Sequence, residues 1–387
     1  MTDTAPRSVL DELCSPYLPF DATSAVWSDV TPVAQAESSS PMCPILYNAE
    51  YSSAMDVYRA LVASNAPATS VPLEGMELSA RGLALTAHLI QLNPSHFSVW
   101  HYRANILLYA PELEKLPGGR AGVLRAELGW LDNLAHANMK SYQVWQHRRI
   151  VVAALGDPSS ELQFSADNLA RDAKNYHTWA YRQWVLAHFG GLSLPTAVEE
   201  AVEEPGKAQF AQLWEGELDY VDELLREDVR NNSAWNHRWY VCFARFGISA
   251  HISVDQERIE EVRKTIAFEK AYARASILGT PNNASAWTHL RALHTSVPHE
   301  LRTPMSEALP WVETLVSTPK EAEADATVDI MGRSPVGALE WCLDCITSAT
   351  PDAEQRAEHL VKRLITVDSV RKRFWAYRLK TIRRHLH

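Results

Sequence analysis

The sequence predicts an all-α protein: an α-α superhelix, a crescent-shaped solenoid of helical hairpins, with an extended N-terminal arm. Three observations predict this fold. Apolar residues recur with a helical period, a Trp-x-x-Arg motif returns along the chain, and glycine is scarce, at 15 of 387 residues. Few glycines in a chain with 46% apolar residues favour helices around a substantial core over a turn-rich β protein.

The Trp-x-x-Arg motif, preceded by an asparagine-containing turn, marks the second helix of each predicted hairpin. The complete copies carry Trp100, Trp145, Trp179, Trp235 and Trp375. A degenerate copy at Trp287 has its arginine, Arg291, displaced by one position. The second and third copies lie 34 residues apart, which is the length of a two-helix repeat. Tryptophan and arginine at i and i+3 share a helix face, so we expect packing by the ring and a bond from the arginine to a neighbouring carboxylate or carbonyl.

The first helix of each hairpin is predicted by apolar residues spaced 4, 3 and 4 apart. Such stripes run from Leu124 to Ala135, from Leu162 to Ala173 and from Trp214 to Leu225. This spacing has the period of a helix and does not fit the period of two in a strand. Glycine favours the end of a helix, so we expect the second helices to stop at Gly156, Gly190 and Gly247.

The domain organisation follows from composition. Residues 1–75 are rich in proline and serine and predict an irregular arm with a short helix around Ala54 to Ala63, while 76–387 form the helical-repeat domain. A Glu-, Ala- and Pro-rich stretch at about 190–210 predicts an inserted loop, and 319–334 is similar. Residues 1–13 lack the apolar segment of a signal peptide, and no run approaches the ~20 apolar residues of a membrane span.

Charge and cysteine content exclude several classes of protein. The net charge of -10 argues against a nucleic-acid binder. Five scattered cysteines indicate reduced thiols in a cytoplasmic protein. Cys342-x-x-Cys345, on a predicted helix, lacks the two further ligands of a zinc site, so we predict buried free thiols and no metal ligand in this chain. A Gly-rich phosphate loop and a Gly-x-Ser-x-Gly elbow are both missing, which excludes nucleotide hydrolases and serine esterases.

The copies differ just before the motif tryptophan, where each second helix opens. The second copy has Lys140 and Tyr142 there, and the third has Lys174 and Tyr176. If the hairpins stack, these turns line one rim, and a lysine with a tyrosine at a helix N-terminus suits an anion. The alternative is that these lysines are only solvated surface groups.

Longer runs resemble a known family. The run from Lys140 to Arg149, Lys-Ser-Tyr-Gln-Val-Trp-Gln-His-Arg-Arg, resembles the second repeat of the protein prenyltransferase α subunit shared by farnesyltransferase and type I geranylgeranyltransferase. Residues 172–184 and 227–236 resemble later repeats. The segment from Trp27 to Pro32 is similar to the Trp-x-Asp-hydrophobic-x-Pro signature of the family's arm. The resemblance therefore extends from about residue 27 to the end of the chain.

The resemblance implies a crescent of hairpins around a separate β subunit. That subunit is expected to carry the catalytic zinc and most of the isoprenoid pocket, with magnesium accompanying the diphosphate and no metal bound by this chain. The implied reaction joins farnesyl, or geranylgeranyl with another β subunit, from its diphosphate to the cysteine of proteins that end in CaaX, such as small GTPases. No nucleic-acid partner and no membrane insertion are implied, and the location is cytoplasmic.

The resemblance also implies roles for individual residues. Lys140 matches the family's lysine that stabilises charge on the leaving diphosphate. Gln143 matches the glutamine that binds the terminal CaaX carboxylate. The other expected substrate-binding residues are Tyr142, Asn175, Tyr176, His177 and Phe97. Phe97 stands where the family often has a tyrosine, so a hydroxyl contact from that position is lost.

Two alternatives are also consistent with the sequence. A tetratricopeptide-like scaffold that binds peptides without catalysis shares the repeat length and the two-helix pattern, but its consensus suits neither the Trp-x-x-Arg motif nor the arm at Trp27. The α subunit of the Rab geranylgeranyltransferase shares the tryptophan repeats. The arm and the run from Lys140 to Trp145 fit the CaaX type better.

Overall fold

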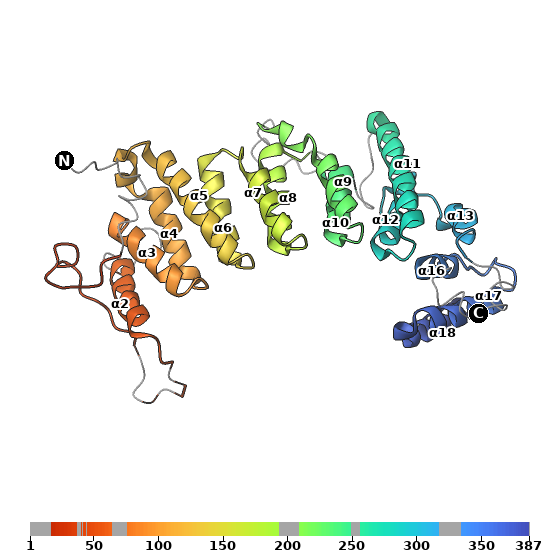
Figure 1. Ribbon diagram of the computed structural model, residues 1–387, viewed down its shortest axis with the longest axis horizontal. Helices are drawn as coiled ribbons and strands as arrows, with labels where there is room; N and C mark the ends of the chain where they lie inside the picture. Colours follow the sequence, from red (N-terminus) through yellow and green to blue (C-terminus); the bar gives the residue numbers. More distant parts are fainter. Residues whose placement is uncertain are drawn as a thin grey trace. The chain divides into compact units, whose positions relative to one another are not determined.

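A computed structural model gives the structure of the chain. It describes residues 17–36, 40, 42–43, 45–63, 76–192, 209–248, 256–316 and 334–386. Within these ranges every regular element is a helix, which confirms the all-α class (Figure 1). No helix in the described ranges combines the length and apolarity that crossing a bilayer requires. The predicted loops at 190–210 and 319–334 lie almost entirely outside the described residues, as do residues 1–13.

The chain divides into two compact units, Met1–Val185 and Leu186–His387. The helices of the first unit are α2 (Ala49–Ala63), α3 (Ala80–Leu92), α4 (Phe97–Tyr109), η1 (Pro111–Lys115), α5 (Gly119–Ala137), α6 (Tyr142–Leu155), α7 (Glu161–Arg171) and most of α8 (Tyr176–Gly190). Helix α3 packs on α4, α5 packs on α6, and α4 contacts both helices of the next hairpin. The hairpins α3–α4 and α5–α6 therefore stack one on the other in sequence order.

The described part of the arm packs onto the first repeat. Trp27 is buried and donates its indole N–H to the carbonyl of Leu18 at 2.9 Å. Trp27 and the buried face of α2 belong to the same core as α3 to α6. Helix α2 begins at Ala49, five residues before the predicted start, because the Asn48 side chain accepts the Glu50 backbone N–H at 2.8 Å and caps the first turn. The arm boundary at residue 75 stays a prediction.

The second unit continues the pattern of hairpins. Its helices are η2 (Ala211–Trp214), α9 (Glu217–Glu227), α10 (Asn232–Cys242), η3 (Ala244–Phe246), α11 (Gln256–Gly279), α12 (Ala284–Thr295), η4 (His299–Leu301), η5 (Met305–Ala308), α13 (Leu309–Glu313), α16 (Val336–Asp344), α17 (Ala353–Val367), η6 (Ser369–Arg371) and α18 (Lys372–Leu386). Helix α9 packs on α10, α11 on α12, and α17 on both α16 and α18.

Several helix ends differ from the predicted ones. The stripe from Trp214 is interrupted, because Gly216 adopts a φ of 77° and α9 begins only after it. Helix α7 ends at Arg171, so Ala173 lies in the following turn. Gly156 ends α6 in the left-handed conformation, as predicted, and α8 ends at Gly190. Before Gly247, α10 already stops at Cys242 and a 3-10 turn completes the element.

The motif tryptophan ties each second helix to the turn before it. In five copies its indole N–H donates to the carbonyl six residues earlier, at 2.8–3.0 Å. The pairs are Trp100 with Pro94, Trp145 with Met139, Trp179 with Ala173, Trp235 with Val229 and Trp287 with Pro281. All five rings are buried. The ring therefore fills the core while its one polar atom is satisfied, which confirms the packing role.

In the first two copies the motif arginine binds carboxylates on neighbouring helices. Arg148 donates to both oxygens of Glu161 at 2.7 and 3.0 Å, and also to Asp132 at 2.7 Å. Arg103 forms the equivalent paired contact with Glu127 at 2.7 and 2.6 Å. Two parallel N–H···O bonds fix direction as well as distance, so these pairs orient one helix against the next. The arginine partners predicted from the motif are confirmed.

Glu127 also meets a histidine. His147 lies 2.9 Å from its Oε1 atom, and both side chains are buried. Burial alone would raise the pKa of this carboxyl. The charge of Arg103 and the hydrogen bond to His147 outweigh burial and lower the pKa to about 2. The fully buried Glu127 therefore stays ionised at neutral pH because its partners are buried with it.

We predict that Glu127→Gln lowers the free energy of unfolding by about 3–5 kcal/mol, because Arg103 is left without its buried counter-charge. Urea denaturation followed by tryptophan fluorescence measures this loss. Glu112→Gln, on the exposed surface of η1, is the matched control and should change stability by less than about 0.5 kcal/mol. Equal effects of the two substitutions would contradict the structural role of Glu127.

The stability that Glu127 contributes through Arg103 should depend on pH. The folded-state pKa of Glu127 is below its usual value of 4.5, so its stabilising contribution is complete above pH 4.5. The contribution should then be lost as the pH falls towards about 2. The difference in unfolding free energy between wild type and Glu127→Gln should therefore shrink across this window.

Candidate functional site

The expected site residues stand on the turns that open α4, α6 and α8 in the first unit. Ser141 caps α6 by accepting the Val144 backbone N–H, so Lys140 lies in the turn and Tyr142 is the first helical residue. Asn175 caps α8 by accepting the backbone N–H groups of His177 at 2.9 Å and Thr178 at 3.3 Å. These side-chain caps place the candidate residues at neighbouring helix N-termini.

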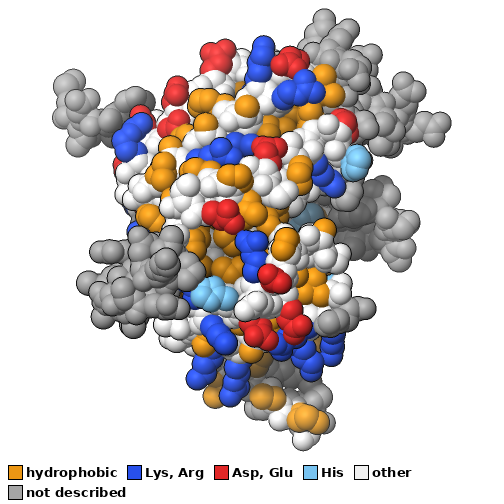
Figure 2. Space-filling model, turned by 90° about the vertical axis from the view of Figure 1, so that its right-hand side faces the viewer, with side chains coloured by type: hydrophobic (Ala, Val, Ile, Leu, Met, Phe, Trp, Pro, Cys, Tyr) orange, Lys and Arg blue, Asp and Glu red, His pale blue; other side chains and the backbone are white. Residues whose placement is uncertain are grey.

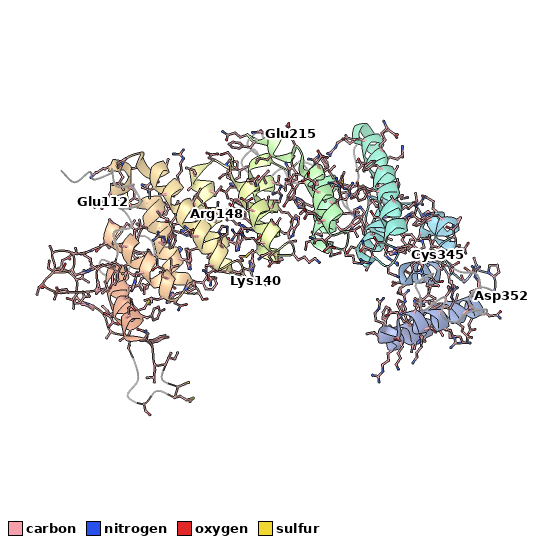
Figure 3. All side chains as sticks on the ribbon, viewed as in Figure 1. Glu112, Lys140, Arg148, Glu215, Cys345 and Asp352 are labelled. Carbon is pink, nitrogen blue, oxygen red and sulfur yellow. The ribbon has the colours of Figure 1, made fainter. Side chains whose placement is uncertain are left out.

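Lys140 points into solvent at the end of its hairpin. In Figure 3 it lies at the turn between α5 and α6, whereas Arg148 lies along the helix among its packed neighbours. The Lys140 side chain is 80% exposed, and its Nζ atom is 3.9 Å from Asp172 Oδ2. An exposed pair at that separation contributes little stability. Lys140 is therefore a cation whose local contact leaves it accessible to an anionic ligand.

Aromatic rings from two consecutive repeats gather beside this turn. The rings of Tyr142 and His177 meet edge to face with centroids 4.4 Å apart, and Tyr176 contacts His177 at 5.6 Å. Tyr142 and Tyr176 remain 64% and 69% exposed. Partial burial lowers the pKa of His177 below its usual 6.5, so the imidazole is neutral at neutral pH. We call Tyr142, Tyr176 and His177 the rim aromatics.

Gln143 connects the second hairpin to the first. Its Nε2 atom donates to the Ser95 carbonyl at 3.1 Å, and its Oε1 atom accepts from the Ser141 hydroxyl at 3.1 Å. Phe97 opens α4 two residues after Ser95 and is 69% exposed. Within the described residues, no ring contact joins Phe97 to the rim aromatics. Gln143 is thus tied to the first-repeat turn, and Phe97 stands near it as a separate apolar surface.

Asn175 differs from the other candidates because it is buried. Its Oδ1 atom caps α8, and its Nδ2 atom donates to the Met139 carbonyl and to Asp172, both at 3.3 Å. Asn283 makes the same pattern of bonds in the second unit, capping α12 and donating to the Val229 carbonyl. The Asn175 side chain therefore serves the repeat architecture, and direct substrate contact does not fit its geometry.

Asp172 also belongs to this turn, although the sequence pattern did not single it out. Its Oδ2 atom lies near Lys140 Nζ and also accepts from Asn175, so it links the cation to the buried cap. The sequence does repeat this spacing, because Asp172 precedes Asn175 by three residues, as Asp228 precedes Asn231. The bond between turns of different repeats could not be read from that spacing.

The described residues hold no group of three or more His, Cys, Asp or Glu side chains that could bind a metal ion. Cys342 and Cys345 are free, as predicted, but they are half-buried where buried thiols were expected. Cys345 follows the end of α16 at Asp344 (Figure 3). Burial raises the pKa of Cys342 to about 12 and that of Cys345 to about 11, which disfavours the thiolate needed for zinc binding.

The contact between the rim aromatics gives a direct test. We predict that His177 titrates below pH 6.5 in the folded chain, measured by NMR of the imidazole resonances and assigned with His177→Asn. Tyr142→Ala should move the His177 pKa back towards 6.5, because the ring that buries the imidazole is removed. A His177 pKa at or above 6.5, or no response to Tyr142→Ala, would rule out this packing.

Comparison with known proteins identifies the repeats. The family model described as the protein prenyltransferase alpha subunit repeat matches residues 79–110, 124–155, 158–189 and 214–245. These ranges cover the hairpins α3–α4, α5–α6, α7–α8 and α9–α10, apart from the first turn of α5 and the last residue of α8. Each copy includes one motif tryptophan and the arginine that follows it. The repeats found in the sequence are therefore those of this family.

Curated relatives fall into two types. The chain is 37% identical over 269 residues to protein farnesyltransferase/geranylgeranyltransferase type-1 subunit alpha of Pisum sativum, covering 69% of this chain and 65% of the relative. It is 29% identical over 228 residues to geranylgeranyl transferase type-2 subunit alpha of Rattus norvegicus, covering 58% of this chain and 36% of the relative. The chain thus spans less than two thirds of either relative, and activity, substrates and partners do not follow from these matches alone.

A solved structure agrees with the fold. A chain of Candida albicans protein geranylgeranyltransferase-I complexed with GGPP matches with a TM-score of 0.66 and 25% identity, covering 94% of this chain and 100% of that chain. The predicted α-α superhelix class is confirmed by this match. Four matched repeats on four observed hairpins show that the chain carries the protein prenyltransferase alpha subunit repeat.

Proposed function

We propose that this chain is the α subunit of a heterodimeric CaaX protein prenyltransferase. With its β subunit it would transfer farnesyl, or geranylgeranyl with another β subunit, from the isoprenoid diphosphate to the cysteine of a CaaX protein. The observation that carries the proposal is the exposed Lys140 beside the rim aromatics, on the turns of two matched repeats. The type-1 relative with 37% identity supports the CaaX class.

The transfer separates charge in a defined way. The cysteine sulfur forms a bond to C1 of the isoprenoid, the C1–O bond to the diphosphate breaks, and its electron pair leaves with the diphosphate. The thiol proton is released to solvent before the sulfur attacks. Zinc, which we assign to the β subunit, would supply the thiolate, and magnesium would accompany the diphosphate. The chemical demand on this chain is to stabilise negative charge that grows on the leaving group.

Lys140 meets that demand in the proposal. An ammonium is a compact point charge that suits a phosphate oxygen. The 80% exposure of the side chain leaves it free to contact a ligand, and its Nζ atom lies 3.9 Å from Asp172. Covering this rim with the β subunit would exclude water and strengthen the charge interaction. Asn175 then acts as a positioning residue, because it holds Asp172 and the Met139 turn.

The remaining candidates would bind the substrate peptide and the lipid. Gln143 uses one Nε2 hydrogen for Ser95, so a second N–H is available for a terminal carboxylate. Tyr142, Tyr176 and the neutral His177 present ring faces and polar tips at the same rim. Phe97 would offer an apolar contact only. These residues recognise the substrate, whereas Lys140 acts on the leaving group.

The proposal predicts a specific effect of Lys140→Ala. With a cognate β subunit, the substitution should lower kcat for transfer to a CaaX peptide by 10²–10³-fold, about 3 kcal/mol, by analogy with removal of one oxyanion donor. Affinity for the isoprenoid diphosphate should change much less, because the lysine acts where charge develops. Lys174→Ala, at the same position one repeat later, is the matched control and should retain full turnover.

Other outcomes would favour the rival functions. Unchanged turnover in Lys140→Ala would remove the assigned role of this lysine. Transfer to a Rab protein that depends on an escort protein, with none to CaaX peptides, would indicate the type-2 enzyme, which the rat relative represents. Recovery of varied substoichiometric peptides on the tagged chain, with no one-to-one β subunit, would indicate a non-catalytic peptide-binding scaffold.

A further inference from the structure

Helix α18 carries a continuous stripe of exposed side chains. Arg373, Tyr377, Lys380 and Arg384 are spaced 4, 3 and 4 residues apart, so they lie on one face of the helix, and all four are exposed. At a rise of 1.5 Å per residue the stripe is about 17 Å long. We call these residues, with the neighbouring exposed Lys372, the basic stripe.

The other face of α18 anchors the helix in the second unit. Trp375 is fully buried, and Leu379 and Ile382 pack in the same core as residues of α17. Arg378 pairs with Asp344, and Arg383 pairs with Glu354 and Glu358. The helix therefore depends on its inner face, and the basic stripe is not needed to hold it in place.

The cations of the basic stripe are unusual because they have no acidic partners. Lys372, Arg373, Lys380 and Arg384 form no ion pair with any residue that the structure describes. Arg378 and Arg383, on the same helix, are both paired. In Figure 2 Lys and Arg side chains gather at the lower edge of the molecule, where the C-terminal helix lies. In a chain of net charge -10, an unpaired group of cations is a local exception.

Apolar and aromatic side chains lie beside these cations. Val370 is 94% exposed, Phe374 is 40% exposed, and Tyr377 stands within the stripe at 64% exposure. Lysine and arginine attract the anionic headgroups of lipids, and aromatic rings with a polar tip settle at the boundary between headgroups and acyl chains. Tyr377 lies within the stripe, Phe374 lies beside it on α18, and Val370 precedes it on η6, so cations and exposed apolar groups occur together at this helix.

We propose that the basic stripe of α18 docks the chain reversibly on an anionic lipid bilayer. Charge complementarity and exposed rings interleaved with the cations favour a lipid surface over an acidic peptide. Screening over about 8 Å at physiological salt lets a local cluster act despite the negative net charge. The inference does not depend on the proposed transfer reaction, because no rim residue takes part in it.

The test is cosedimentation of the full chain with vesicles. Binding to phosphatidylcholine vesicles that contain phosphatidylserine is expected, with little binding to phosphatidylcholine alone and a steep decrease as salt rises. A variant with Lys372, Arg373, Lys380 and Arg384 all changed to Gln should bind more than 100-fold more weakly, since each charge near the surface contributes roughly fivefold. Far-UV circular dichroism checks that α18 is retained.

The matched control removes the same charge elsewhere. Lys115, Arg125, Arg171 and Lys264 are exposed, and changing all four to Gln should leave vesicle binding within about twofold. Phe374→Ser with Tyr377→Ser should weaken binding and abolish the part that survives high salt. Equal binding to neutral vesicles, equal loss in the control, or unchanged binding by the four-charge variant would overturn the proposal. Tighter binding of polyglutamate or duplex DNA by the same cations would also overturn it, in favour of that partner.

Discussion

The bond from the motif tryptophan to the preceding turn is the constraint on which the candidate site depends. In the second repeat, the Trp145 indole donates to the Met139 carbonyl, one residue before Lys140. Asn175, from the third repeat, donates to the same carbonyl while it caps α8. The position of Lys140 relative to Tyr142 and the rim is thus fixed from two repeats at once, by groups that never touch a ligand.

The buried ion pairs set how one helix faces the next. Glu127 is held by Arg103 and His147, and Glu269 is held in the same way by Arg238 and His289. Pairs of this kind add little net stability compared with apolar residues, because both charges lose their hydration. Their directional bonds instead allow one packing register, which repeated apolar stripes alone would not specify. We infer that the register of the hairpins, and so the spacing of the rim turns, rests on these pairs.

The helical class and most helices could be predicted from sequence because period and glycine stops are local properties. The errors arose where a local feature overrode the period, as with Gly216, which excludes Trp214 from α9, and with Asn48, which starts α2 early. Differences between the repeat copies pointed to Lys140, Tyr142 and Tyr176 at one rim, but the individual roles of the rim residues came only from the family resemblance. The burial of Asn175 and the role of Asp172 come from hydrogen bonds between turns of different repeats, and no spacing within one repeat contains that information.

The repeat also explains why functional surfaces appear where its copies depart from one another. The buried tryptophan and arginine positions are occupied by internal bonds in nearly every copy, so they are unavailable to partners. The copies also differ at helix starts and on outer faces. At one such start the second copy presents Lys140, and on one outer face α18 presents an unpaired basic stripe. An exposed helix face needs only to be polar to stay dispersed in water, and mixed charges would meet that need. A face made of unpaired cations and exposed rings exceeds it, which is why the charge of α18 indicates a partner.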